Sequence, residues 1–251
     1  MNSFIKIPFL KRLIPSIIKK YAFYFSDYER EIIHEGILFN LDIRHLIDRT
    51  FYINREYEEQ SFQNLVDVIN DQSSEYFLDV GACWGIYSLR LAKKFDKLKI
   101  KAIDPIKKNI NRINESINKN KFSNIEVFQT AVGDNNGTIL LGSNSDWSPN
   151  YKINEENTEV TEQSLIKPLD DLFNLKYHKI VMKIDVEGFE FEMLSGAKEI
   201  LKNNQCYLQI EIRYENYDKI EKLLNEIGYY NHKGTKPHEP NTYLDCNFQN
   251  Y

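Results

Sequence analysis

The stretch Phe77-Leu-Asp-Val-Gly-Ala-Cys-Trp-Gly-Ile-Tyr87 decides the fold of this chain. An apolar run ends at Asp79, a turn with Gly81 and Gly85 follows, and helical spacing begins at Ile86. A buried strand that opens through a glycine-rich turn into a helix is typical of a doubly wound α/β sheet. Glycine lets the backbone approach a ligand, and the free N–H groups of the helix start suit anionic groups. The stretch therefore predicts a nucleotide-like ligand at the end of this strand.

The glycine spacing narrows the class of ligand. A dinucleotide fingerprint would need glycines at 81, 83 and about 86, where the chain has Gly81, Cys83 and Ile86. A phosphate loop of the G-x-x-x-x-G-K-[ST] type is absent from the sequence. The acid before the turn, Asp79, suits a ligand with an ammonium group, such as S-adenosylmethionine. A plain strand–helix turn without a ligand is the alternative at this point.

A second acid follows at the distance expected for a ribose contact. The predicted strand 99–104 ends in Asp104, about twenty residues past the turn, where an acid accepts hydrogen bonds from a ribose diol. Pro105 ends the strand because it lacks an N–H donor. An ordinary turn residue at a strand end is the competing interpretation of Asp104.

Length and composition limit the classes of function. The 251 residues carry a formal net charge of −5, which argues against a nucleic-acid surface as the main site. Cys83, Cys206 and Cys246 are few and widely spaced, so we expect a reducing, cytoplasmic compartment without disulfides or a zinc site. The sequence leaves an oligomer open.

The N-terminal segment 4–25 is apolar but interrupted by lysines, an arginine and prolines. It is too interrupted for a membrane span and lacks a clear signal-peptide pattern. A basic amphipathic segment is compatible with weak contact to an anionic membrane surface. A helix packed on the domain, or an arm that contacts a partner, is the plainer interpretation. We expect an N-terminal arm and cap over 1–55 and a catalytic domain over 56–251.

Strand and helix patterns alternate along most of the chain, which predicts a mostly parallel sheet with helices on both faces. The expected core strands are 77–80, 99–104, 125–132, 179–185 and 207–213, and the expected helices are 57–69, 86–94, 107–119, 188–201 and 217–227. A strand over 37–43, a hairpin near Asn135, an irregular stretch over 142–164 and an antiparallel edge from Tyr229 and 243–248 complete the pattern. Ligands bind at the carboxyl ends of such strands, so Asp79, Asp104, Asp185 and Glu211 should converge.

The run Val181-Met-Lys-Ile-Asp-Val-Glu-Gly-Phe-Glu190 is the second informative motif. Lys183 and Asp185 share one face of the strand, and Glu187 precedes the next helix. Buried charges are retained when paired or used, so a cluster at the pocket favours function. An ion pair of Lys183 with Asp185 or Glu211 is the structural alternative. We expect Glu190 and Glu192 on a solvated helix face.

These motifs resemble those of the FkbM-type S-adenosylmethionine-dependent methyltransferases. The matching pieces are Phe77–Gly85, Ala102–Pro105, Gln129–Asp134, Leu169–Leu172, Lys183–Glu190, Leu194–Ala197 and Leu208–Glu211, within about residues 55–230. The resemblance implies a class I, Rossmann-like methyltransferase fold, here with an antiparallel C-terminal edge and an N-terminal α+β cap. It implies O-methylation of a hydroxyl on a sugar, glycan or related small molecule. Motifs and resemblance together assign the cofactor to Asp79, Gly81, Ala82, Cys83, Gly85, Asp104, Pro105, Thr130, Ala131 and Asp185.

The chain departs from the family pattern at three places. Cys83 stands where Asn is usual, so one polar contact to the amino-acid end of the cofactor is expected to be lost. Asp104 stands where Glu is usual, and a shorter acid reaches a ribose if the backbone lies closer. Adenine recognition would fall on backbone groups of Thr130 and Ala131, with Asp134 as a further candidate.

Methyl transfer to a hydroxyl needs alignment, exclusion of water and a proton acceptor. Asp185 is the first candidate for the base or substrate orienter, followed by Glu187 and Glu211, and Lys183 holds an acid in place or lowers the pKa of the hydroxyl. His34 and His45 are weaker candidates from the cap. Trp147 and Tyr151 are candidates to stack on a sugar face.

Three alternatives stay open. A Mg²⁺ ion on Asp185 and a neighbouring acid is one, although we expect no metal. A nicotinamide-linked oxidoreductase and a noncatalytic module that binds the cofactor are the others.

Overall fold

A computed structural model describes residues 28–143, 151–153, 160–231 and 243–250, together with a few helical positions between 16 and 24. Most of the segment 4–25, and Trp147, therefore lie outside the described residues. Every helix within the described ranges is too short or too polar to cross a bilayer.

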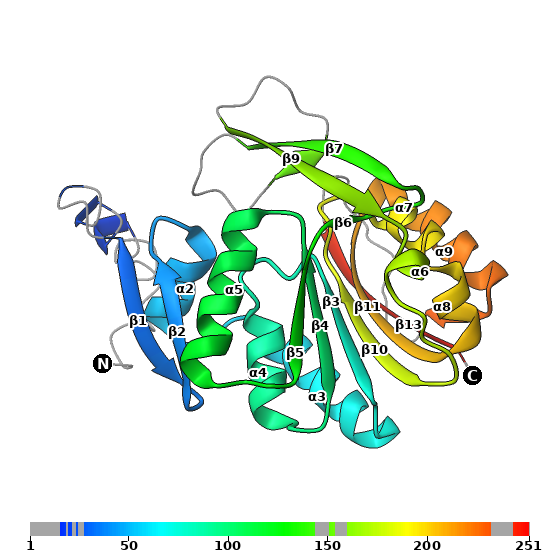
Figure 1. Ribbon diagram of the computed structural model, residues 1–251, viewed down its shortest axis with the longest axis horizontal. Coiled ribbons are helices and arrows are strands. Elements are labelled where there is room, and N and C mark those ends of the chain that lie inside the picture. The colour runs from blue at the N-terminus through cyan, green and yellow to red at the C-terminus, as the bar shows by residue number, and fades with distance from the viewer. Residues whose placement is uncertain are drawn as a thin grey trace.

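A seven-stranded sheet forms the centre of the molecule (Figure 1). Its strand order is β12-β13-β11-β10-β3-β4-β5. The five parallel strands are β3 (Tyr76–Val80), β4 (Lys99–Asp104), β5 (Ile125–Gln129), β10 (Lys179–Ile184) and β11 (Gln205–Arg213). The edge strands β12 (Tyr229–Asn231) and β13 (Tyr243–Asn250) run antiparallel. The predicted fold class and its antiparallel C-terminal edge are confirmed.

Helices cover both faces of this sheet, each through one apolar stripe. One face packs against α3 (Glu59–Gln72), α4 (Ile86–Lys94) and α5 (Lys107–Asn120). The other packs against α6 (Leu169–Leu172), α7 (Glu190–Ser195), α8 (Lys198–Asn203) and α9 (Tyr217–Glu226). The helix α3 buries the four residues that its spacing singles out: Phe62, Leu65, Val66 and Ile69.

The predicted single helix over 188–201 is wrong, because the chain breaks between α7 and α8 at Gly196. A Cβ atom at this glycine would lie 1.8 Å from the carbonyl oxygen of Gly133. The backbone therefore passes another backbone segment too closely for any side chain. After the break, the Asp170 carboxylate accepts hydrogen bonds from the backbone N–H groups of Glu199 and Ile200, which satisfies the start of α8.

A second, four-stranded sheet stands above the carboxyl ends of the core strands (Figure 1). It consists of β6 (Ala131–Val132), β7 (Gly137–Ser143), β8 (Lys152–Ile153) and β9 (Val160–Lys167), in the order β6-β9-β7-β8. The expected core strand 125–132 is therefore divided at Thr130, where pairing passes from one sheet to the other. The hairpin predicted near Asn135 is wrong, because β6 and β7 each pair with β9.

Part of the stretch predicted to be irregular, residues 160–164, belongs to strand β9. Its sequence is polar because alternate residues of the strand, such as Thr161 and Gln163, face water. A sheet with one solvated face loses the continuous apolar run that marks a buried strand.

The N-terminal cap consists of β1 (Glu29–His34), β2 (Ile37–Asp42) and α2 (Leu46–Asn54). A buried arginine, Arg90 on α4, holds it to the domain. Its guanidinium contacts Glu35 at 2.9 Å and Glu59 at 2.8 Å, and lies 3.7 Å from the ring centre of Phe62. Trp84 of the glycine turn packs edge-on against Phe39 of the cap. The cap thereby rests directly on the elements that carry the first motif.

We expect Gly196→Ala to lower the free energy of unfolding by about 2–3 kcal/mol, because its Cβ would press against backbone that cannot move aside. The melting temperature should fall by roughly 5–10 °C. Gly137→Ala is the matched control, since its Cβ would make only ordinary contacts with the side chains of Ile166 at 3.6 Å and Asn135 at 4.0 Å. Equal thermal stability of the two variants would contradict this account.

Candidate active site

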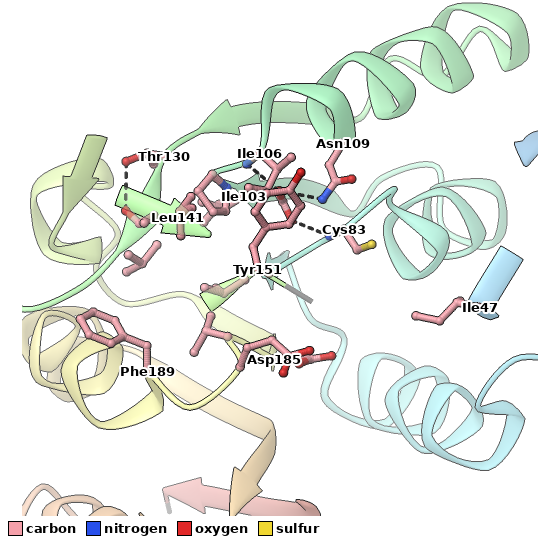
Figure 2. A pocket seen from close by; sticks show the side chains of 18 of the residues that line it. Ile47, Cys83, Ile103, Ile106, Asn109, Thr130, Leu141, Tyr151, Asp185 and Phe189 are labelled. Carbon is pink, nitrogen blue, oxygen red and sulfur yellow. Dashed lines mark hydrogen bonds between the residues drawn. The ribbon is translucent and has the colours of Figure 1, made fainter. Parts of the chain in front are cut away.

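Two adjoining cavities lie at the carboxyl ends of β3, β4 and β10. The larger has a volume of about 140 Å³ (Figure 2), and the smaller about 30 Å³. The residues that line both are Ile47, Tyr57, Gly81, Cys83 and Asp185. The two sequence motifs therefore meet between the cavities, as predicted.

Gly81 permits that meeting. Its φ is +82°, and a Cβ atom there would lie 1.8 Å from the carbonyl oxygen of Asp185. The Asp185 N–H also donates to the carbonyl of Val80 at 3.0 Å. The turn after β3 and the end of β10 are thus in backbone contact. The N–H groups of Gly81 and Ala82 both donate to the carbonyl of Ile103, so they hold the turn.

Asp104 is the polar centre of the larger cavity. One carboxylate oxygen accepts from the Cys83 N–H at 2.8 Å, and the other from the Ile106 N–H at 2.9 Å and the Asn109 amide at 3.0 Å (Figure 2). Burial raises the pKa of Asp104 to about 7, against these hydrogen bonds. The oxygen with a single donor has a lone pair left for a ribose hydroxyl.

The remaining wall of the larger cavity is largely apolar and suits an aromatic base. The contributing residues are Ile103, Pro105, Ile106, Ala131, Val132, Leu141 and Phe189. Thr130 also lines this cavity, but its hydroxyl donates to backbone carbonyls, so its backbone would serve the ligand. Asp134 is exposed and absent from the lining. Tyr151 extends into this cavity toward Asn109 (Figure 2), on the side predicted for the cofactor.

The smaller cavity is charged. Lys183 lies 3.1 Å from Asp185 with its side chain 11% exposed, and it lines the same cavity as the buried Asp79. Burial alone would lower the pKa of Lys183. The carboxylates of Asp185, Glu58 and Asp79 outweigh this effect, so the pKa of Lys183 is raised above its usual value. Asp79 accepts a 2.6 Å hydrogen bond from Ser88, and burial raises its pKa. This cavity offers carboxylates to a cationic group, as the first motif predicts.

Glu211 adjoins Asp185 but lines neither cavity. The two carboxyl groups are hydrogen-bonded, and burial together with the Asp185 charge raises the pKa of Glu211 to about 8. Glu211 therefore keeps its proton near neutral pH. The expected convergence of Asp79, Asp104, Asp185 and Glu211 is therefore observed around the two cavities.

The acids after β10 differ in placement. Glu187 lines the larger cavity, with its backbone in the left-handed region at φ +53°. Glu190, predicted on a solvated face, is fully buried, which corrects that prediction. One of its carboxyl oxygens accepts a 2.6 Å bond from the Gly188 N–H, and the other has no partner in the structure. Burial raises the pKa of Glu190 to about 7. Glu192 is partly exposed.

Three predicted contributors lie elsewhere. Gly85 lines neither cavity; it begins α4 at φ +80°, close to Ile113. His34 and His45 lie in the cap and also line neither cavity. Burial lowers the pKa of His45 to about 4, which is typical of a histidine that stays neutral.

Three residues at the site, Ile47, Tyr57 and Glu58, were not predicted from the sequence. Ile47 lies on α2, while Tyr57 and Glu58 precede α3, and no motif marks them. Glu58 accepts a 2.7 Å hydrogen bond from the Tyr87 hydroxyl. Their sequence signal is weak: Tyr57 and Glu58 are an aromatic residue and an acid immediately before helix α3, which packs against the sheet.

Among the described residues, no group of three or more histidines, cysteines and acids is arranged to hold a metal ion. The magnesium alternative gains no support from these side chains.

A family model described as "Methyltransferase FkbM domain" matches residues 79–230. A solved structure described as the methyltransferase FkbM from Methylobacillus flagellatus superposes with a TM-score of 0.50 at 18% identity, covering 70% of this chain and 43% of that one. WbdD, in complex with the kinase inhibitor LY294002, gives a TM-score of 0.51 at 14% identity, covering 82% of this chain and 44% of that one. The chain thus spans less than half the length of these two proteins. No curated protein sequence matches it.

We expect Cys83→Asn to raise the free energy of unfolding by about 0.5–1 kcal/mol, because residue 83 has φ +50° and asparagine tolerates this left-handed region. Serine is similar in size to cysteine but lacks asparagine's tolerance of the left-handed region, so Cys83→Ser should not raise the free energy of unfolding. Urea unfolding of both variants measures the difference. A less stable Asn variant would show that packing of the thiol outweighs backbone strain.

The raised pKa of Glu190 predicts a pH dependence of stability. The folded chain keeps this proton up to about pH 7, whereas the unfolded chain loses it near 4.5, so stability falls as pH rises between these values. The contribution is about 3 kcal/mol. Glu190→Gln keeps the acceptor for Gly188 and cannot titrate, so it should lose less stability from pH 5 to pH 8. Glu192→Gln should follow the wild type, and identical slopes for all three would refute the assignment.

Proposed function

This chain belongs to the FkbM methyltransferase-domain family, and on that premise we propose that it methylates a hydroxyl of a sugar, glycan or related small molecule, with S-adenosylmethionine as the donor. The observation that carries the proposal is the meeting of Asp104 and the Lys183–Asp185 cluster across the Gly81 turn. This meeting joins a larger cavity with a mostly apolar wall to a smaller charged one.

The residues present fit the donor. S-adenosylmethionine, when bound, supplies a methyl group that its sulfonium already activates. Asp104 has a free lone pair for a ribose hydroxyl, and the apolar wall suits adenine. Asp79 and Asp185 offer carboxylates to the ammonium group. Cys83, where the family has Asn, leaves the amino-acid end with one side-chain contact fewer.

The charges around the smaller cavity support a neutral acceptor. Four carboxyl groups, those of Glu58, Asp79, Asp185 and Glu211, surround the single ammonium of Lys183. The smaller cavity is assigned to the ammonium end of the donor, and a phosphate or carboxylate on an acceptor placed beside Asp185 would be repelled by this cluster. Hydroxyl groups, in contrast, donate hydrogen bonds to carboxylates. A polyol such as a sugar fits this pattern.

Proton transfer is assigned to the same cluster. Asp185 lines both cavities, so its carboxylate is placed to orient the acceptor hydroxyl and accept its proton. Lys183 holds Asp185 at 3.1 Å. Glu211, with a pKa of about 8, still holds its own proton near neutral pH, so in this scheme it donates a hydrogen bond to Asp185 and keeps that carboxylate in place. Glu187, on the rim of the larger cavity, orients the acceptor in this scheme.

The deciding experiment incubates the protein with methyl-labelled S-adenosylmethionine and fractionated host extracts. We expect label in a carbohydrate-containing fraction, on oxygen. Tight binding of S-adenosylhomocysteine without transfer to any fraction would instead favour a noncatalytic module. Binding of NAD without binding of S-adenosylmethionine would favour an oxidoreductase.

For Asp185→Asn we expect methyl transfer to the labelled fraction to fall by about a hundredfold or more, because the amide cannot accept the proton. Asp96→Asn, at an exposed position, is the control. Turnover and S-adenosylhomocysteine affinity that both match the wild type would remove Asp185 from the mechanism.

A further inference from the structure

The two cavities of the site join at five residues, and Tyr57 is the aromatic one among them. The others are Ile47, Gly81, Cys83 and Asp185. Tyr57 lies in the chain before the segment that matches the family model, 79–230, so the family motifs do not account for it. It is half-buried at the entrance to α3.

The inference rests on the proposed function, since the order of groups in S-adenosylmethionine decides what lies at this junction. Its ribose end is assigned to Asp104 in the larger cavity. Its ammonium end is assigned to Asp79 and Asp185 in the smaller one. The sulfonium is bonded between these ends, so the junction is where its positive charge must lie.

Several contacts hold Tyr57 at the junction. Its hydroxyl is hydrogen-bonded to Glu58, and Glu58 also accepts the 2.7 Å bond from the Tyr87 hydroxyl. The rings of Tyr57 and Tyr87 meet edge to face, with centres 6.4 Å apart. Glu58 itself has a left-handed backbone at φ +47°, a strained conformation that tends to persist at functional sites. The turn before α3 is therefore fixed against the cavity.

We propose that Tyr57 recognises the positive charge beside the reacting methyl group, and so lets the site distinguish S-adenosylmethionine from its uncharged product. Aromatic rings attract cations through their electron-rich faces, and sulfonium and quaternary ammonium groups share this chemistry. The neighbouring carboxylate of Asp185 adds attraction for the same charge. Release of S-adenosylhomocysteine after transfer is then favoured, because the charge that Tyr57 recognises is gone.

Calorimetric titration tests this inference without an acceptor. Tyr57→Leu should weaken binding of S-adenosylmethionine by about fivefold to twentyfold. Binding of S-adenosylhomocysteine should stay within about twofold. Sinefungin, which carries an ammonium group in place of the methylated sulfonium, should weaken like S-adenosylmethionine. Tyr57→Phe keeps the ring and should behave as the wild type, and Tyr177→Leu, at a position 88% exposed, is the surface control.

Equal weakening of both cofactor forms, or no weakening, would overturn the inference. Loss of selectivity in Tyr57→Phe would assign the effect to the hydroxyl and overturn it as well. Tyr57→Met, with a flexible apolar side chain, gives the same comparison if the Leu variant does not fold. A wild-type chain that binds neither cofactor form would contradict the proposed function itself, and the inference with it.

Discussion

The backbone contact between Gly81 and Asp185 is the constraint on which the site depends. With 1.8 Å between a hypothetical Cβ and the Asp185 carbonyl oxygen, only glycine fits at this position. The contact brings the turn after β3 against the end of β10, two strands that pair in parallel. One strand carries Asp79 and the other Lys183, so a single close approach sets the distance between the glycine turn and the Lys183–Asp185 cluster.

Around this contact, the buried charged groups are stabilised by neighbouring side chains and backbone N–H groups. Asp104 is stabilised by three hydrogen bonds, and Lys183 by the carboxylates that surround it. Desolvation nevertheless raises the pKa of Asp104, Glu190 and Glu211 toward or above neutrality. The excess of carboxyl over ammonium groups makes the site a better host for a cation than for an anion, which supports the proposed sulfonium donor and neutral acceptor.

Periodicity located nearly every core strand and helix, because burial on one stripe or on both faces leaves a clear pattern in the sequence. Periodicity failed where the local structure depends on contacts between residues far apart in the sequence. The break at Gly196 follows from the approach of Gly133, and the pairing of β6 and β7 with β9 rather than each other follows from the second sheet. Glu190 looked like a surface residue because its burial comes from packing that helical spacing does not reveal.

The sequence by itself determined the α/β fold, the glycine turn and the acids at the strand ends, since each depends on residues within one strand–turn–helix unit. Only the tertiary structure decided which of these groups line the cavities: Gly85 begins helix α4, and His34 and His45 lie in the cap, away from both cavities. It also brought in Ile47 and Tyr57, whose positions depend on how the cap and α3 pack against the sheet. That packing joins residues far apart along the chain, and no local pattern records it.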